Sequence, residues 1–334
     1  MFFNYKMLFI YPSLFFGTLI AMSSSSWVSA WMGLEINLMS MAPILISKFK
    51  SKSMEATIKY FIFQAIASSL MIFFIFLSMM NSYLSLNMFT ELIITASLIF
   101  KAGMAPLQFW FPQVINFSEW IPSILLMTWQ KLAPFTLLMY LNSSILIWSI
   151  MLSALVGMLG GINQFNFKFI LVYSSILHSA WLLCLILCSN MFWVMYMCFY
   201  TFISLSVILF LYKFNIVSVS SPFLLKEKMF KLMFISNFLS LAGMPPFLGF
   251  SMKIISIFIF FNSDIFKLII SILILSSFIS LYFYLRTIYT SFILLNWNIS
   301  TMNSVSYNFK LKLILFSILS ILGNIFFPMA VLLT

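Results

Sequence analysis

Long apolar runs follow one another along nearly the whole chain. We count about eleven runs of roughly 20 residues, the length that an α-helix needs to cross a hydrocarbon core of about 30 Å. Hydrophobic residues make up 63% of the 334 residues and charged residues 7%, which leaves too little polar surface for a soluble protein. The sequence therefore predicts an all-α integral membrane protein. The predicted spans cover approximately residues 7–26, 27–47, 56–80, 91–114, 121–141, 144–162, 168–188, 191–212, 231–261, 265–288 and 310–333.

Positive charges test this count independently. With eleven spans, the N-terminus and every second connection share one side of the membrane, and that side collects thirteen of the 17 positive residues. Loops on the cytoplasmic or matrix side are enriched in Lys and Arg, so we expect the N-terminus to face that side. We therefore attribute the net charge of +11 to the loops on one side of the membrane, and we expect no nucleic-acid partner. The thirteen residues are Lys6, Lys48, Lys50, Lys52, Lys59, Lys168, Lys213, Lys226, Lys228, Lys231, Arg286, Lys310 and Lys312.

The connections between spans are short, apart from two over about 213–230 and 290–309. Both are expected on the basic side. We predict a single transmembrane domain over residues 1–334. The N-terminal segment carries neither an A-x-A cleavage site nor an Arg- and Ser-rich presequence, so we interpret it as the first mature helix.

One of the apolar runs contains a lysine. Lys101 lies roughly 15 Å into the run that opens near Glu91, about half-way across the hydrocarbon core. A charge at that depth costs about 3 kcal/mol, so such a lysine is a functional candidate by default. Pro106 cannot donate to the Ala102 carbonyl and Gly103 lowers helix propensity, so the helix should break just after the lysine. Irregular backbone at this depth is tolerated beside protein or a water-filled cavity, as in transport sites.

The segment around this break recurs in the second half of the chain. Residues 102–106 read AGMAP and residues 242–246 read AGMPP. The offset covers about five spans, an odd number, so units that begin alike would lie in opposite orientations across the membrane. We therefore predict inverted-topology repeats with two broken helices, over about 91–114 and 231–261. The predicted breaking residues are Gly103, Pro106, Gly243, Pro245 and Pro246, and Pro134 adds a kink to another span.

Five titratable side chains lie at a similar depth in five different spans. Counting from the span ends places each roughly 12–15 Å deep, in a row parallel to the membrane plane. Such a row suits proton transfer along a hydrated track inside the bilayer. Alternatively, the histidine can hydrogen-bond a neighbouring helix and the glutamate can form a structural ion pair with a lysine. The five residues are Glu35, Lys101, Lys131, His178 and Lys253.

The other charged and metal-binding residue types predict no further chemistry. Glu55 and Lys59 are spaced i, i+4 near a span end, which favours an ordinary interfacial ion pair. The three cysteines match no zinc or iron–sulfur spacing, so we predict no metal site. The sequence has no glycine-rich phosphate loop, Rossmann fingerprint or cysteine cluster, so we expect the chain to bind neither NADH, flavin nor iron–sulfur by itself.

Six motifs in combination carry a family resemblance. They are Trp31–Asn37, Glu55-Ala56 with Lys59–Phe61, Lys101–Pro106 with Phe109-Trp110, Thr128–Pro134, Tyr173–His178 and Leu241–Phe250. They resemble the mitochondrial NADH dehydrogenase subunit 2 family, which belongs to the antiporter-like membrane subunits of respiratory complex I. The likeness covers about residues 17–253. The charge-poor composition, rich in Phe and Met, also resembles insect mitochondrial proteins.

The resemblance implies a core subunit of the proton-pumping NADH:ubiquinone oxidoreductase in the inner mitochondrial membrane, with its N-terminus toward the matrix. It assigns Glu35, Lys101, Lys131 and Lys253 to a central hydrophilic axis, with His178 between two half-channels. The implied partners are the lipid bilayer and other membrane subunits: 4L and 4 as neighbours, and the lateral helix of subunit 5. NADH, FMN, iron–sulfur clusters and ubiquinone would belong to other subunits.

The chain departs from the family pattern at two points. Longer members have fourteen helices, whereas this sequence predicts eleven. Gln108 stands where histidine is usual, and an amide cannot relay a proton by titrating, so any role there would use hydrogen bonds to water. Two other functions stay open from the sequence: a stand-alone cation/proton antiporter, and a purely structural membrane subunit.

Overall fold

The computed structural model describes residues 2–46, 50–80, 87–141, 144–188, 191–221, 228–245, 247–261 and 266–293. Thirteen helices account for the regular structure of these ranges, with one isolated antiparallel bridge between Asn166 and Ser218. The helices are α1 (Phe2–Ser23), α2 (Trp27–Leu45), α3 (Ser51–Met80), α4 (Asn87–Ala102), α5 (Trp110–Phe117), α6 (Trp120–Met127), α7 (Trp129–Leu138), α8 (Ser144–Ile162), α9 (Phe167–Leu187), α10 (Phe192–Lys213), α11 (Lys228–Ala242), α12 (Leu248–Phe261) and α13 (Phe266–Ile293).

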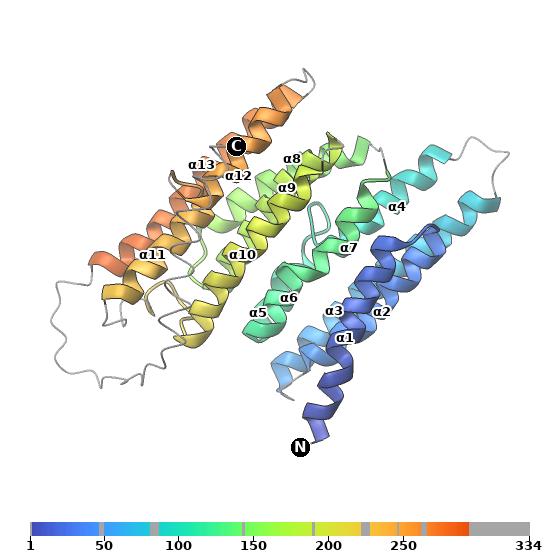
Figure 1. Cartoon of the computed structure of the whole chain (residues 1–334), viewed down its shortest axis with the longest axis horizontal. Helices are drawn as coiled ribbons and strands as arrows, with labels where there is room; N and C mark the ends of the chain where they lie inside the picture. Colours follow the sequence, from blue (N-terminus) through green and yellow to red (C-terminus); the bar gives the residue numbers. More distant parts are fainter. Residues whose placement is uncertain are drawn as a thin grey trace. The chain divides into compact units, whose positions relative to one another are not determined.

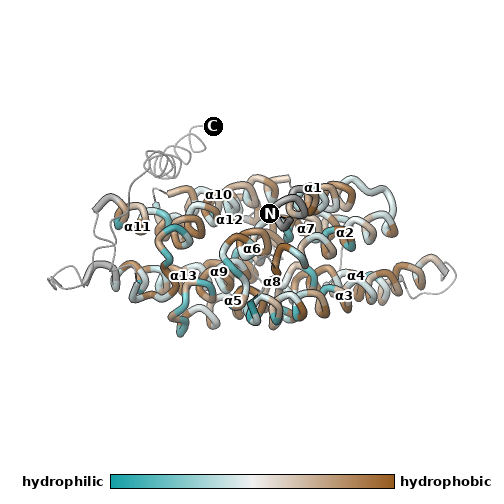
Figure 2. Tube along the Cα trace, turned by 90° about the horizontal axis from the view of Figure 1, so that it is seen from below, coloured by the Kyte–Doolittle hydropathy of each residue, from teal (hydrophilic) through white to brown (hydrophobic). Residues whose placement is uncertain are grey.

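Six of these helices are long and apolar enough to cross a membrane: α2, α3, α8, α9, α10 and α13. The traces of these helices are mostly white to brown in the hydropathy colouring of Figure 2. Parts of α1, α11 and α12 are apolar but shorter. Because each long helix satisfies its own backbone hydrogen bonds, the chain is suited to cross the bilayer several times. The all-helical, multi-pass class predicted from the sequence is confirmed.

Three predicted spans contain two shorter helices each. Residues 91–114 comprise most of α4 and part of α5, and residues 231–261 comprise α11 and α12. Within 121–141, α6 and α7 meet at Thr128, and Pro134 lies inside α7. The Thr128 hydroxyl donates to the Ile124 carbonyl at 2.8 Å, and side-chain bonds of this kind bend helices. The predicted span over 310–333 lies outside the described residues.

The chain divides into two compact units. The first unit comprises Met1–Gly157 and Leu171–Trp193, and the second comprises Met158–Ile170 and the chain from Val194 onward. The boundaries fall inside α8, at the start of α9 and at the start of α10. Each unit is described by itself below.

The first unit is built around close helix crossings. α1 lies along α2, and α3 packs against α2, α4 and α5 (Figure 1). At the crossing of α1 and α2, a Cβ on Gly33 would lie 2.6 Å from the Ala21 nitrogen, so the two backbones are in contact there. α7 joins α1 through Trp129, whose indole nitrogen donates to the Thr18 hydroxyl at 3.1 Å. α7 also packs against α4, so α2, α3, α4 and α7 lie side by side.

The second unit combines an aromatic core with paired loops. Phe167, Phe210, Phe234 and Phe238 contact one another through their rings, and α11 packs against α12 and α13. The loop before α9 pairs with the loop after α10, because Val219 donates its backbone N–H to the Phe165 carbonyl at 2.9 Å. The second unit therefore has loops that are tied together at one end of its helices.

Candidate functional site

In the first unit, α4 ends at Ala102, one residue after Lys101. Gly103 adopts a positive φ of 70°. Its N–H donates to the Phe100 carbonyl at 3.1 Å, and the Met104 N–H donates to the Ile99 carbonyl at 3.2 Å. These two bonds form the Schellman helix ending, for which a glycine at positive φ is the usual residue. The glycine therefore ends the helix, and Pro106 follows outside it.

Two side chains donate further hydrogen bonds to carbonyls at this helix end. The Gln64 amide donates to the Lys101 carbonyl at 3.1 Å, and the Trp110 indole donates to the Phe100 carbonyl at 3.1 Å. The last carbonyls of a helix lack intrahelical partners, and in an apolar setting they need substitutes. The Lys101 side chain is itself buried, at 6% exposure. Its positive charge in the last turn is favoured by the helix dipole.

A small polar cavity lies beside Lys101. It has a volume of about 10 Å³, and its walls include the side chains of Asn37 from α2, Tyr60 and Gln64 from α3, and Gln130 from α7. Such a volume is about the minimum that one water molecule needs. Glu35 of α2 interacts electrostatically with both Lys101 and Tyr60. The structure thus brings the predicted Glu35 and Lys101 into one polar neighbourhood.

Lys131 occupies a different position in the same unit. It is 2% exposed, its ammonium donates to the Ser175 carbonyl of α9 at 3.0 Å, and it lies 5.1 Å from the centre of the Phe111 ring. Ser175 precedes His178 by three residues, so both lie on one face of α9. His178 is buried at 3% exposure. Lys131 is therefore joined to the helix turn that carries the predicted histidine.

The second unit contains the fifth predicted residue, Lys253 of α12. Gly243 has a φ of 77°, and the N–H of Met244 donates to the Leu239 carbonyl at 3.2 Å. α11 thus ends in the same Schellman arrangement as α4. The Lys253 ammonium reaches back and donates to the Ala242 carbonyl at 2.8 Å. A buried lysine lies against the C-terminal end of an interrupted helix in both units.

The structure places the remaining predicted residues as follows. Pro245 follows the end of α11, and Pro246 lies outside the described residues. Gln108 is buried, and its side-chain oxygen has no hydrogen-bond partner among the described residues. Glu55 and Lys59 form the predicted ion pair at 2.7 Å. Within the described ranges, no cluster of His, Cys, Asp and Glu could hold a metal ion.

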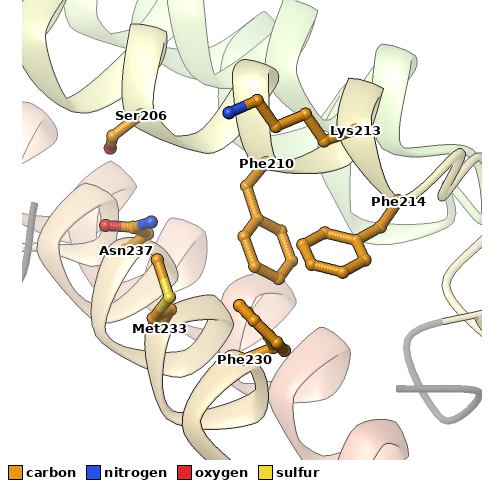
Figure 3. A pocket seen from close by; sticks show the side chains of 7 residues that line it. All are labelled: Ser206, Phe210, Lys213, Phe214, Phe230, Met233 and Asn237. Atoms are coloured by element: carbon orange, nitrogen blue, oxygen red, sulfur yellow. The ribbon is translucent and has the colours of Figure 1, made fainter. Parts of the chain in front are cut away.

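The second unit has another pocket, between α10 and α11, of about 10 Å³. Figure 3 shows Phe210, Phe214 and Phe230 gathered at one end, with Ser206 and Asn237 at the other. The Ser206 hydroxyl already donates to the Ile203 carbonyl at 2.8 Å. Because its walls are mostly aromatic and aliphatic, we attribute this pocket to packing.

The prediction from the sequence did not include the amide and hydroxyl groups around Lys101. The Gln130 amide nitrogen donates to the Asn37 side-chain oxygen at 2.8 Å, and the Tyr60 hydroxyl lies 3.5 Å from the Gln130 side-chain oxygen. These groups link three helices across the cavity. The available signal was the occurrence of Asn37, Gln64 and Gln130 inside apolar runs, where polar side chains need partners.

Comparison with known proteins identifies the family. The family model described as "NADH:quinone oxidoreductase/Mrp antiporter, TM" matches residues 24–280. NADH-ubiquinone oxidoreductase chain 2 of Anopheles gambiae is 39% identical over 326 residues, which cover 95% of this chain and 95% of the relative. The chain belongs to the NADH-ubiquinone oxidoreductase chain 2 family. The chain 2 protein of Locusta migratoria is 34% identical, with 96% of this chain and 95% of the relative covered, and that of Elephas maximus is 37% identical, with 84% of each covered.

Solved structures share the fold at lower sequence identity. A chain of respiratory complex I from Thermus thermophilus matches with a TM-score of 0.81 at 20% identity, covering 95% of this chain and 78% of that chain. A chain of an archaeal membrane-bound sulfane sulfur reductase matches with a TM-score of 0.80 at 16% identity, covering 96% and 74%. The chain therefore has the antiporter-like membrane fold that its motifs predict.

Proposed function

We infer that this chain is a core membrane subunit of the proton-pumping NADH:ubiquinone oxidoreductase, respiratory complex I. Its membership of the chain 2 family supports this function. We propose that it moves protons along Glu35, Lys101, Lys131, His178 and Lys253, and that NADH, FMN, iron–sulfur clusters and ubiquinone are bound by other subunits.

The observation that carries the proposed proton path is the Lys101 helix end. A buried ammonium there lies beside a polar cavity of about 10 Å³ and interacts with Glu35. A charge in the membrane interior is expensive unless it faces polar groups. When the conformation moves the carboxylate away from the ammonium, the charged form of the lysine becomes less stable and it releases its proton. This is how a conformational change can drive proton transfer at this site.

We also propose the finer architecture that the sequence predicts. It comprises about eleven spans in a single membrane domain, with inverted-topology repeats and broken helices after Lys101 and before Lys253. The matching glycine endings at Gly103 and Gly243 support the repeat. The N-terminus and the loops over about 213–230 and 290–309 face the matrix, in the inner mitochondrial membrane. The proposed neighbours are lipid, subunits 4L and 4, and the lateral helix of subunit 5.

Two measurements test this function. In a native gel of gently solubilised inner membranes, this chain should comigrate with NADH dehydrogenase activity at a mass far above 38.7 kDa. If it ran alone or as a small oligomer, a stand-alone antiporter would replace the complex I assignment.

The second measurement is proton uptake by the complex carrying Lys101→Met or Lys131→Met. General acid–base groups contribute typically about 10² to 10⁴-fold, so each variant should slow NADH-driven proton uptake at least about tenfold while the complex still assembles. Lys52→Met is the matched control, because Lys52 is exposed. An assembled Lys101→Met complex that pumps at the control rate would leave only a structural role for this lysine.

A further inference from the structure

Lys131 holds its charge with few polar contacts. It is 2% exposed, and among the described residues its ammonium donates one hydrogen bond, to the Ser175 carbonyl at 3.0 Å. The ion pairs within the described ranges involve other lysines, and Lys101 differs in having an electrostatic interaction with Glu35. An ammonium has three donors, and a buried charge is costly unless neighbouring groups compensate it. Lys131 therefore needs a further stabilising group.

The ring of Phe111 is a group that the structure places against this ammonium. Its centre lies 5.1 Å from the Lys131 nitrogen Nζ, inside the limit of about 6 Å for attraction between a cation and an aromatic face. Phe111 is 1% exposed, so both partners are shielded from water, and desolvation makes this attraction stronger. The ring and the Ser175 carbonyl together stabilise the buried ammonium.

The same ring lies against the segment that follows Lys101. A Cβ on Gly103 would lie 3.1 Å from Cγ of Phe111 and 3.2 Å from its Cδ2, so the absence of a side chain lets the backbone approach the ring. Gly103, with its φ of 70°, is also the residue that ends α4. Phe111 of α5 is therefore packed between the interrupted end of α4 and the lysine of α7.

Trp110 attaches the first turn of α5 to the same helix end. Its indole N–H donates to the Phe100 carbonyl at 3.1 Å, and its ring centre lies 5.5 Å from that of Phe111. Because a helix has 3.6 residues per turn, neighbouring side chains project about 100° apart. Trp110 can thus bond to the end of α4 while Phe111 turns toward Lys131.

We propose that Phe111 is a positioning residue for Lys131: its ring stabilises the ammonium and transmits to it the movements of the segment after Lys101. The inference rests on the proposed proton path. When the end of α4 shifts, Gly103 and Trp110 displace the first turn of α5, and the ring withdraws from the ammonium. Lys131 then retains the carbonyl contact and loses the aromatic one, so its charge is less stable. A change at Lys101 reaches Lys131 through packed side chains.

The first test compares three variants in the intact complex. Phe111→Leu removes the aromatic face but keeps an apolar side chain, whereas Phe111→Tyr keeps the face. Phe234→Leu makes the first change at an equally buried phenylalanine of α11, whose ring contacts other aromatic rings. NADH-driven proton uptake is measured for each variant per assembled complex.

Phe111→Leu should slow proton uptake about tenfold, the change that corresponds to losing a buried cation–π contact. Phe111→Tyr should retain most of the parent rate because its ring still faces the ammonium, and Phe234→Leu should pump near the parent rate. Equal rates for Phe111→Leu and Phe234→Leu would overturn the inference. A Phe111→Tyr complex as slow as Phe111→Leu would overturn it too, because the aromatic face would then have no role.

Cryo-electron microscopy of the parent complex tests the coupling even if Phe111→Leu does not assemble. Among particles frozen during NADH oxidation, some classes should show a shifted 103–109 segment and a ring centre more than about 6 Å from the Lys131 nitrogen. A contact that stays at 5.1 Å in every class would overturn the inference.

Lys131→Met in the same uptake assay separates this inference from the proposed function. If Lys131→Met slows uptake but Phe111→Leu does not, the role of Phe111 fails and the proton path stands. If Lys131→Met pumps at the parent rate, the proton path itself fails.

Discussion

At the scale of single residues, the two helix-ending glycines make room for other side chains. A Cβ on Gly243 would lie 2.9 Å from the Lys253 ammonium nitrogen, and a Cβ on Gly103 would lie 3.1 Å from the Phe111 ring. Both glycines also have positive φ, which L-residues other than glycine seldom adopt. The same residue type therefore ends the helix and lets a lysine or an aromatic ring approach its backbone.

Gly243→Ala should impair pumping without changing any charge. The left-handed conformation costs an alanine about 1–2 kcal/mol, and the new methyl group displaces the Lys253 side chain from the Ala242 carbonyl. We expect NADH-driven proton uptake to fall several-fold in complexes that assemble. Leu232→Ala, at an exposed position of α11, is the control, and equal rates for the two variants would contradict this account of Gly243.

At the scale of helices, the crossing of α1 and α2 decides where Glu35 lies. A Cβ at Gly33 would approach the Ala21 nitrogen to 2.6 Å and the Gly17 carbonyl oxygen to 2.8 Å, so a larger residue forces the helices apart. Side chains on α2 would shift with it. Small residues allow this close backbone approach in membrane helices generally.

Gly33→Val should therefore reduce the amount of assembled complex. We expect a clear loss of the complex I band in native gels, because separated helices forfeit packing that hydrophobic burial does not replace within a bilayer. Met32→Val changes the neighbouring residue, which is 55% exposed, and should leave the band unchanged. A Gly33→Val band as strong as the control band would show that the crossing tolerates the added volume.

A second contact between elements joins α13 to the loop after α8. The Arg286 guanidinium donates to the Ile162 and Gln164 carbonyls and lies 5.4 Å from the Phe165 ring centre. Thr290, one turn further along, donates to the Val219 carbonyl at 3.1 Å. One end of α13 therefore holds both paired loops of the second unit.

Arg286→Leu should destabilise this end of the unit by about 3 kcal/mol, because it leaves two carbonyls without their charged donor. The temperature at which half of the NADH oxidation activity is lost should fall by several degrees. Arg286→Lys keeps the charge but cannot form the two-pronged contact, so its midpoint should lie between those of the parent and Arg286→Leu. A parent-like midpoint for Arg286→Leu would exclude a stabilising role.

At the scale of the whole molecule, contacts within each unit agree with the charge-based topology. Lys50 pairs with Glu119 at 3.6 Å in the first unit, and the 163–166 and 216–220 loops pair in the second. The predicted topology places all four of these segments on the basic side. An odd number of spans between joined loops would have separated them by the thickness of the membrane.

Labelling from each side tests this topology. A cysteine introduced at Lys50 or Asn215, both exposed, should react with an impermeant thiol reagent from the matrix side. A cysteine at Met191, which is 73% exposed, should react from the opposite side. Reaction of the Asn215 and Met191 positions from one side would contradict the span count between them.

Several features of the fold could be predicted because they depend on local sequence. Apolar run length predicts membrane helices, the spacing of Glu55 and Lys59 predicts their ion pair, and Gly103 predicts the end of α4. The interruption at Thr128 was not predicted, because a hydroxyl bonding to its own helix competes weakly with the regular helix. The motif at 242–246 likewise predicted a helix end, and α11 ends at Ala242.

The amino-acid order alone determines the class of this protein, its family and the identity of its buried charges, because hydrophobicity and motif spacing are properties of the chain. Tertiary structure decides which groups meet. It places Gln130 between Asn37 and Tyr60, directs Lys131 to α9 and leaves the Glu35 oxygen Oε1 without a hydrogen-bond partner among the described residues. Such partners come from helices far apart in sequence, and their contacts depend on crossing angles and packing that no local pattern encodes.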